Sequence, residues 1–384
     1  MTITAGKAAG PNWILRRLWL ASFLCFGVLY AYAEPFTNTL AARVTDVAMR
    51  SVVLGLFGLT ALVARPLSGA LADRWRPRWV LGLGALAMAI GVWAVNASQA
   101  IEVLVLARML QAIGYATFST AGVAWAARLG GTATRATRLA RYGMAANLAM
   151  ALMPTLSHAM SAIAPAGWMS ALLGLAAVGA GVCAQIDDGA TAPRATAARQ
   201  PLRGVVSGVG PRVAGLALLL GLGFGAFWQY LPLQAGANAG VAYGVYGLVI
   251  LATRWAAGPW IDRQSFGRVA TWSGIWLTLG AAAVAVGGWL QWPGVAGIAV
   301  GCGLLQPAVF AAAVRRAPES PGLATGWCYA AFDLGLALSG WVLGPALSAW
   351  GPTGVFAATA GLMILVVGVG RERHDVSRHS LQAG

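Results

Sequence analysis

Charged residues are scarce in this sequence of 384 residues, where they make up only 10%. Soluble globular domains usually carry about 25%, so the scarcity argues against a soluble protein. Hydrophobic residues make up 59%, which excludes a disordered chain. The 51 glycines show no three-residue period, which excludes a collagen. Abundant glycine is common where membrane helices pack closely, and the composition therefore predicts a protein that crosses the membrane many times.

Paired cysteines and catalytic signatures are also missing. The four cysteines occur singly in apolar segments, at Cys25, Cys183, Cys302 and Cys328. Disulfide bonds or a metal site would need such ligands to converge, so we interpret the cysteines as small buried apolar residues. No nucleophile–base set, metal-ligand spacing or phosphate-binding loop is present. The sequence therefore predicts no metal, no cofactor, no enzymatic activity and no coupling to ATP.

The net charge of +15 comes from 26 basic and 11 acidic residues. In a soluble protein this excess would suggest a nucleic-acid partner. Here nearly all basic residues fall in the tails and in alternate connections, and positive charge favours the cytoplasmic face of a membrane. The exceptions are Arg43 and Arg50 in the first opposite connection, and Arg65, Arg108 and Arg254 within apolar runs. We therefore expect no nucleic-acid binding, a place in the bacterial inner membrane and cytoplasmic termini.

Apolar runs of a length that suits about 20 residues per span predict an all-α membrane protein with twelve spans. The expected spans are 15–36, 50–72, 79–96, 102–127, 139–162, 168–185, 212–234, 242–261, 269–290, 294–314, 323–349 and 354–370. The long polar stretch 187–211 lacks helical periodicity, which predicts a flexible cytoplasmic linker between six-helix bundles at 1–186 and 212–384. The N-terminus also resembles a cleaved signal peptide, but its removal would leave an odd number of spans.

The two halves are related in sequence. Residues 61–74 read ALVARPLSGALADR, and residues 250–263 read ILATRWAAGPWIDR. At one constant offset four residues are identical, in the pairs Arg65 and Arg254, Gly69 and Gly258, Asp73 and Asp262, and Arg74 and Arg263. A fainter match aligns Asn147-Leu148 with Asp333-Leu334. Parallel six-helix repeats are one construction of secondary transporters, although a duplicated scaffold without transport activity would show the same repeat.

These segments resemble a family signature. The run GALADRWRPR from Gly69 to Arg78 resembles the loop motif of the major facilitator superfamily, and GPWIDR at 258–263 resembles its second copy. Arg108-x-x-Gln111-x-x-Gly114 is similar to a motif common in the proton-coupled members of that superfamily. The resemblance implies the major facilitator fold, in which twelve helices form two pseudo-symmetric six-helix bundles.

The sequence departs from the superfamily pattern at two places. Arg76 and Pro77 stand where the loop motif usually has glycine and arginine. Exporters of the drug:proton antiporter type usually carry Gly-Pro with repeated glycines in span 5, where this chain has Met153-Pro154. Gly344-Pro345 in span 11 preserves a related pattern, so the chain still resembles the antiporter type, while proton-coupled nutrient uptake stays open as an alternative.

The two loop motifs predict a conformational latch. A glycine lets a neighbouring helix approach closely, and an aspartate at a helix end pairs with an arginine or faces the positive N-terminus of another helix. We expect these contacts to hold the cytoplasmic face closed in one conformation and to release in the other. The predicted latch residues are Gly69, Asp73, Arg74, Arg78, Gly258, Asp262 and Arg263. Arg74 and Arg263 would alternatively only set the topology.

Charged residues within spans are costly and tend to be functional. Asp333 lies near the middle of span 11, which makes it our preferred proton carrier, with Glu34 second; the alternative for Asp333 is a permanently hydrogen-bonded acid. Glu34 and Arg108 fall at similar depth in the outer half of spans 1 and 4, as either a coupling pair or a static salt bridge. Arg65 and Arg254 lie within a turn or two of the cytoplasmic loops, and we expect them to extend to the interface.

A substrate cavity needs polar and aromatic groups that orient its ligand. The candidates are Tyr30, Tyr32, Gln111, Asn147, Phe227, Trp228, Gln229, Tyr230 and Gln306. For the aromatic residues, contact with lipid or a place in an interfacial belt is the alternative. Buried carboxylates with few cations favour a cationic or zwitterionic amphipathic substrate, but the presence of Arg108 leaves the charge of the substrate open.

Together these features predict a proton-coupled secondary transporter, monomeric in membrane lipid, that exports a small organic molecule such as a drug-like compound or a siderophore-like metabolite. Proton-coupled uptake of a nutrient is the alternative within transport. A membrane sensor that transports nothing is a third hypothesis, which the lack of a folded cytoplasmic domain opposes. The mechanism requires two homologous bundles that rock about a water-accessible pocket.

Overall fold

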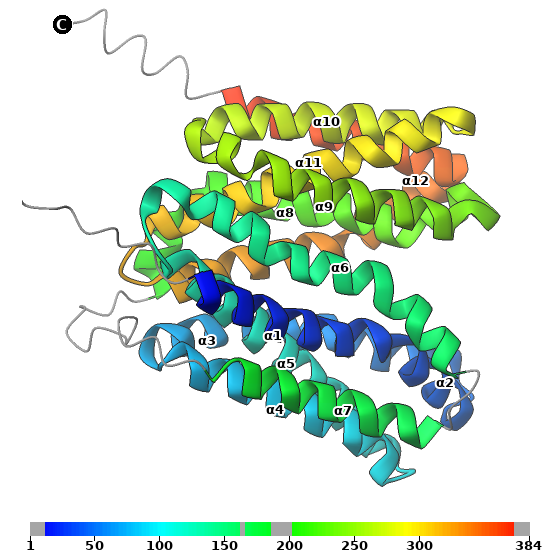
Figure 1. The fold of residues 1–384 in the computed structure, drawn as a ribbon. Coiled ribbons are helices and arrows are strands. Elements are labelled where there is room, and N and C mark those ends of the chain that lie inside the picture. Colours follow the sequence, from blue (N-terminus) through cyan, green and yellow to red (C-terminus); the bar gives the residue numbers. More distant parts are fainter. Residues whose placement is uncertain (1–11, 162–165, 186–201, 372–384) are drawn as a thin grey trace, which may run out of the picture.

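Helices make up nearly all of the residues that the structure, a computed structural model, describes: 12–161, 166–185 and 202–371 (Figure 1). The 3₁₀ helices η1 (Thr132–Thr134), η2 (Gly236–Asn238) and η3 (Gly288–Leu290) are short connections. The α-helices are α1 (Asn12–Ala31), α2 (Ala33–Arg43), α3 (Val47–Arg74), α4 (Pro77–Ala97), α5 (Ile101–Arg128), α6 (Arg135–Ser161), α7 (Ala166–Cys183), α8 (Leu202–Ala235), α9 (Ala239–Arg263), α10 (Phe266–Val286), α11 (Gln291–Arg316) and α12 (Pro321–Arg371).

These helices form twelve membrane spans, which confirms the predicted number. Among the described residues, nine helices are long and apolar enough to cross a bilayer, with α1 and α2 counted as one and α12 counted once. α12 supplies two spans, because Gly351 has a φ of 65° and interrupts the helix there. The set is completed by the shorter apolar α7 and by α6, whose first turns carry Arg135, Arg138 and Arg141.

The spans form two bundles, of which α1 to α7 make up one and α8 to α12 the other (Figure 1). Across the boundary, α6 packs against α9 and α11, while α12 packs against α3 and α5. In the sequence repeat, α3 corresponds to α9, and α6 corresponds to the first part of α12. The boundary is therefore built from two related sets of contacts, and the repeated motifs lie on the helices that meet there.

Glycines bring neighbouring helices within each bundle into backbone contact. A Cβ atom built on Gly280 of α10 would lie 2.6 Å from the Ile298 nitrogen and 2.7 Å from the Gly294 oxygen of α11. Because both of those atoms are backbone, they have little freedom to move away. The abundance of glycine in the sequence thus has a direct use in helix packing.

We expect Gly280→Val to lower the free energy of unfolding by about 1–3 kcal/mol, the usual range for overpacking a tight core. Thermal unfolding of the purified protein in detergent measures this loss. Gly361→Ala in α12 is the control, because a Cβ there meets nothing within 4 Å. Alanine in a helix is favoured over glycine by about 0.5–1 kcal/mol, so an equal loss in both variants would contradict the packing argument.

The predicted linker at 187–211 differs from the structure in its second part. Residues 186–201 lie outside the described residues, but α8 already begins at Leu202 and continues to Gly210, whose φ of 74° kinks the helix. Val205 and Val209, one helical turn apart, are fully buried. The Arg316 guanidinium donates a hydrogen bond of 2.6 Å to the Val209 carbonyl oxygen. Burial of these two valines stabilises a helical turn, which the polar composition of residues 187–211 does not predict.

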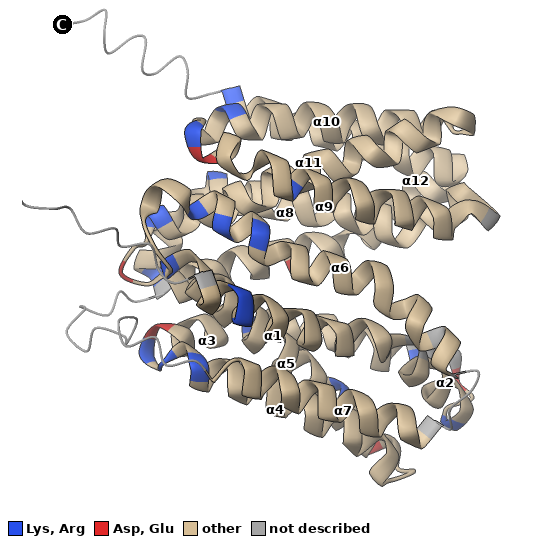
Figure 2. Ribbon diagram, in the orientation of Figure 1, with Lys and Arg blue, Asp and Glu red and all other residues tan. Residues whose placement is uncertain are grey.

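Basic residues gather at one end of the two bundles, which we call the basic end (Figure 2). It includes the connections α3–α4, α5–α6, α9–α10 and α11–α12, and its arginines include Arg74, Arg76, Arg78, Arg128, Arg135, Arg138, Arg263, Arg268, Arg315 and Arg316. The opposite end carries Arg43, Arg50 and Glu102. The described part of the chain thus has the charge asymmetry that the sequence predicts.

Candidate functional site

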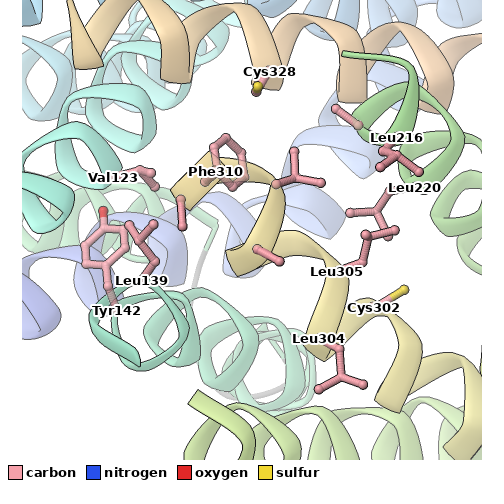
Figure 3. Packing of buried hydrophobic residues seen from close by; sticks show 14 of the residues in the cluster. Val123, Leu139, Tyr142, Leu216, Leu220, Cys302, Leu304, Leu305, Phe310 and Cys328 are labelled. Atoms are coloured by element: carbon pink, nitrogen blue, oxygen red, sulfur yellow. The ribbon is translucent and has the colours of Figure 1, made fainter. Parts of the chain in front are cut away.

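A cavity of about 110 Å³ lies between the two bundles. Its walls come from α1, α5 and α6 of the first bundle and from α8, α9, α11 and α12 of the second. Figure 3 shows part of the apolar lining, where Leu139 and Tyr142 of α6 lie next to Val123 of α5, with Phe310 of α11 close by. The polar or aromatic-hydroxyl lining residues are Tyr30, Tyr115, Tyr142, Asn147, Tyr246, Arg254, Gln306 and Tyr329.

Arg254 is the cation of this cavity lining, and it is only 5% exposed. Its Nη2 donates a hydrogen bond to the Gln306 side-chain oxygen, and its Nη1 lies against Gly143 of α6, where a Cβ would collide with it. The Nε atom is buried with no hydrogen-bond partner among the described groups. The expectation that Arg254 extends to the interface is therefore wrong, because the missing side chain of Gly143 leaves room for the guanidinium between the bundles.

Three of the predicted substrate residues line the cavity: Tyr30, Asn147 and Gln306. The side-chain nitrogen of Asn147 is buried and finds no partner among the described groups. The cavity lining contains no Asp or Glu among the residues that the structure describes. This differs from the expected acidic surroundings of the substrate.

Arg65 forms an ion pair across the bundle boundary with Asp333, with 2.8 Å between Nε of Arg65 and Oδ2 of Asp333. The two side chains are 0% and 10% exposed, so the expectation that Arg65 extends to the interface is wrong as well. The remaining bonds of the guanidinium go to α5, to the Ala116 carbonyl oxygen at 3.4 Å and to the hydroxyls of Ser119 and Thr120. The other hydrogen bonds of Arg65 thus stay within the first bundle, and Asp333 is its ion-pair partner in the second.

Two tyrosines connect this ion pair to the cavity. The Cζ atom of Arg65 lies 4.6 Å from the ring centroid of Tyr115 and 4.1 Å from that of Tyr329. Both tyrosines also line the cavity. The cavity and the guanidinium of the ion pair therefore share these two rings.

At the basic end, Asp73 joins α3 to the start of α12. Its carboxylate accepts hydrogen bonds of 2.7 Å from the backbone nitrogens of Gly322 and Leu323. It also forms an ion pair of 2.6 Å with Arg128. Gly69, one turn earlier, lies against Gly322, so that any side chain at 69 would separate the two helices.

Asp262 repeats this arrangement in the second half, where it joins α9 to the start of α6. It accepts hydrogen bonds from the backbone nitrogens of Ala136 at 2.7 Å and Thr137 at 3.0 Å, and from the Thr137 hydroxyl at 2.6 Å. A Cβ on Gly258 would lie 2.9 Å from the Thr137 Cα. Each aspartate therefore faces the N-terminus of a helix in the other bundle, where backbone N–H groups and the helix dipole favour a negative charge.

The arginines of the predicted latch take less part in the contacts between the bundles than the aspartates do. Arg74 and Arg263 are exposed, and no described hydrogen bond or ion pair includes either of them. Arg78 stacks on Trp79, with 5.3 Å between its Cζ and the ring centroid. Arg128, which sequence analysis did not select, is the cation that binds Asp73.

Of the predicted pair of Glu34 and Arg108, the structure describes the side chain of Arg108 only, because the side chain of Glu34 lies outside the described residues. Arg108 lies over the rings of Phe36 and Phe57, at 4.7 and 4.4 Å, and donates to Gln111 at 3.1 Å. Its Nε is buried without a partner among the described groups. The coupling role of Glu34 and Arg108 stays a prediction.

The other predicted substrate residues do not line the described cavity. Gln111 bonds to the Gly91 carbonyl oxygen, and Tyr32 contacts Ser170 and Val92 inside the first bundle. Among the span 7 candidates, Phe227 stacks on Tyr246 in the core. The other three candidates of span 7 lie elsewhere around α8. Trp228 is 36% exposed, while Gln229 and Tyr230 form hydrogen bonds to α12.

Comparison with solved structures agrees with this fold. Among solved structures, the human organic anion transporter MFSD10 (TETRAN) matches with a TM-score of 0.76 and 15% identity, over 94% of this chain and 99% of that one. The transporter FucP in its outward conformation matches with a TM-score of 0.76 and 12% identity, over 96% and 99%. The proton:xylose symporter XylE matches with a TM-score of 0.72 and 13% identity, over 93% and 94%.

Comparison by sequence gives fewer matches than comparison by structure. No curated protein sequence matches the chain. The sequence model of the Major Facilitator Superfamily matches residues 18–339, which is most of the chain. Together with the twelve spans in two bundles, this match identifies the chain as a membrane transporter that belongs to the Major Facilitator Superfamily.

Proposed function

We propose that this chain is a proton-coupled secondary transporter of the bacterial inner membrane that exports a small organic molecule, a drug-like compound or a metabolite. The basic end would face the cytoplasm together with both termini, in accord with the preference of positive charge for that side. One observation carries the proposal, namely the buried ion pair between Arg65 and Asp333, which joins the two bundles directly behind the cavity.

The ion pair is suited to couple a proton to movement of the bundles. Protonation of Asp333 removes its charge and with it most of the attraction to Arg65, and the separation of a buried pair is worth about 3–5 kcal/mol. Arg65 keeps its bonds to α5 and its contact with the ring of Tyr115, which is also on α5. The guanidinium therefore stays with the first bundle while its ion pair with Asp333 of α12 is lost, so a proton on Asp333 favours separation of the bundles.

The latch contacts determine whether the basic end is open or closed at each step of the transport cycle. With Asp73 and Asp262 bound to the opposite helix N-termini, the basic end is closed and the cavity belongs to an outward-facing or occluded conformation. Asp333 takes up a proton from the outer side, the ion pair breaks and the basic end opens. The proton then leaves to the cytoplasm as substrate binds, Asp333 pairs again with Arg65, and the closed basic end commits the substrate to exit.

Proteoliposomes that contain the purified chain and a trapped pH-sensitive dye test this proposal. A panel of drug-like compounds and metabolites is added on the side of the basic end, and proton movement is recorded. Export antiport predicts that a transported compound drives protons in the direction opposite to its own. If no compound moves protons and an imposed pH gradient accumulates none, the proton-coupled function is contradicted.

Proton-coupled uptake is the second candidate, because two of the structural neighbours are described as proton symporters, for fucose and for xylose. Symport would use the same ion pair, but substrate and proton would bind to the protein together, whereas in antiport they bind in turn. In the same vesicles it predicts that protons move in the direction of the added compound. The sign of the dye signal therefore distinguishes the two candidates.

A further inference from the structure

The two halves of the repeat differ at one chemically decisive position. The Nε of Arg65 in the first half donates to the carboxylate of Asp333 in the second half. The repeat aligns Arg65 with Arg254 and Asp333 with Asn147. The arginine is thus present in both halves, whereas the acid of one half is replaced by a neutral amide in the other.

This replacement leaves a buried cation without a counter-ion. Arg254 is only 5% exposed, and Gln306, the side chain to which it donates a hydrogen bond, is neutral. The Nε of Arg254, equivalent to the atom that binds Asp333 in the other half, has no partner among the described groups, and neither has the side-chain nitrogen of Asn147. Both free atoms are hydrogen-bond donors.

Both donors belong to residues that line the same cavity, and the described lining contains no acidic residue. A buried charge without a partner is unfavourable, and so is a buried donor without an acceptor. An acceptor that carries one negative charge relieves both at once. The planar fork of a guanidinium favours a carboxylate in particular.

We propose that Arg254 and Asn147 bind the carboxylate of the substrate, which takes beside Arg254 the place that the Asp333 carboxylate has beside Arg65. This assignment deepens the proposed transport function by naming its substrate class, a compact organic monocarboxylate. The apolar remainder of the substrate lies against aromatic residues of the lining such as Phe26, Phe224 and Phe310. The cavity volume of about 110 Å³ limits that remainder to a few heavy atoms or one ring.

Binding to the purified full-length chain tests the proposal without any pH gradient. Acetate, butyrate and benzoate are compared with their amides and with benzylamine, in a buffer low in other anions, by thermal unfolding and by calorimetry. We expect at least one carboxylate to bind and raise the melting temperature, while its amide and the amine do not. Arg254→Gln is expected to weaken this binding by roughly tenfold or more, as for other hydrogen bonds to charged groups, and Arg254→Lys to restore part of it.

Asn147→Asp is the sharper variant, because it supplies Arg254 with an aspartate at the position equivalent to Asp333, the partner of Arg65. We expect it to raise the melting temperature of the ligand-free protein and to abolish carboxylate binding. Asn147→Leu removes the amide without supplying a charge, and is expected to weaken binding without that gain in stability.

The proposal is overturned if no carboxylate binds, if amides bind as well as acids, or if binding survives both Arg254→Gln and Asn147→Asp. Its failure is distinguishable from failure of the transport function. Proton coupling measured in vesicles with a neutral or cationic substrate would refute the carboxylate site alone. Carboxylate binding without any proton movement would refute the coupling alone.

Discussion

Asp333→Asn is expected to abolish the accumulation of substrate driven by a pH gradient, down to the level of protein-free vesicles. Asparagine still accepts a hydrogen bond from Arg65 and fills the same volume, but it cannot bind and release a proton. Exchange of labelled for unlabelled substrate across the membrane needs no net proton movement, so we expect this exchange to persist. Paired assays of gradient-driven accumulation and of exchange in proteoliposomes measure the two activities on one preparation.

The matched control is Glu102→Gln, which neutralises an exposed acid in the first turn of α5 at the end opposite the latch contacts. It should leave both activities unchanged. If Asp333→Asn accumulates substrate as well as this control does, Asp333 is not the proton carrier, and Glu34 becomes the next candidate. Loss of exchange together with accumulation would instead indicate that the ion pair is required for the fold or for movement of the bundles.

The sequence predicts the architecture well because its signals are local. Apolar runs give the spans, and the repeated Gly-x-x-x-Asp-Arg segments identify the ends of α3 and α9. The partners of Asp73 and Asp262 are backbone N–H groups of other helices, and no side-chain pattern marks such groups. The motifs thus reveal which residues to inspect, while the helix N-termini that receive them become visible only in three dimensions.

The interior charges show where local reasoning fails. Arg65 lies close to a loop in sequence, so that extension to the interface is the simplest expectation, yet its partner Asp333 is 268 residues away. The repeat does contain the missing signal. It aligns Arg65 with Arg254 and Asp333 with Asn147. An arginine of one half therefore corresponds to an arginine of the other, and the acid that binds the first arginine corresponds to an amide.

The cluster from Phe227 to Tyr230 illustrates the opposite error. Four successive polar or aromatic residues resemble a binding site, but successive residues on a helix are separated by about 100° and point in different directions. Phe227 accordingly packs on Tyr246, and Gln229 reaches Ser339 of α12. Tyr30, Asn147 and Gln306 lie on three different helices, and only the packing of those helices brings them to one cavity.

Asp73→Ala combined with Asp262→Ala is expected to open the basic end. Each carboxylate bonds to two backbone nitrogens at a helix N-terminus, and the loss of such a cap costs about 0.5–2 kcal/mol. The two sites are separate, so their effects should add. A combined loss of about 3 kcal/mol lowers the ratio of closed to open molecules roughly 100-fold. Each single variant should show an intermediate shift.

Spin labels on cysteines introduced at Arg76 and Arg263, both exposed at the basic end, measure the distance between the bundles there. The protein with intact latches should show a short distance, and the double variant a longer one with a broader distribution. Glu319→Ala is the matched control, since it removes an exposed acid at the same end and should leave the distance unchanged. Asp73 bonds to the opposite bundle through backbone nitrogens, and Asp262 through backbone nitrogens and the Thr137 hydroxyl. Substitution of the exposed Arg74 therefore cannot reproduce the opening. An unchanged distance in the double variant would mean that the Arg65–Asp333 pair holds the bundles closed without help from the latch.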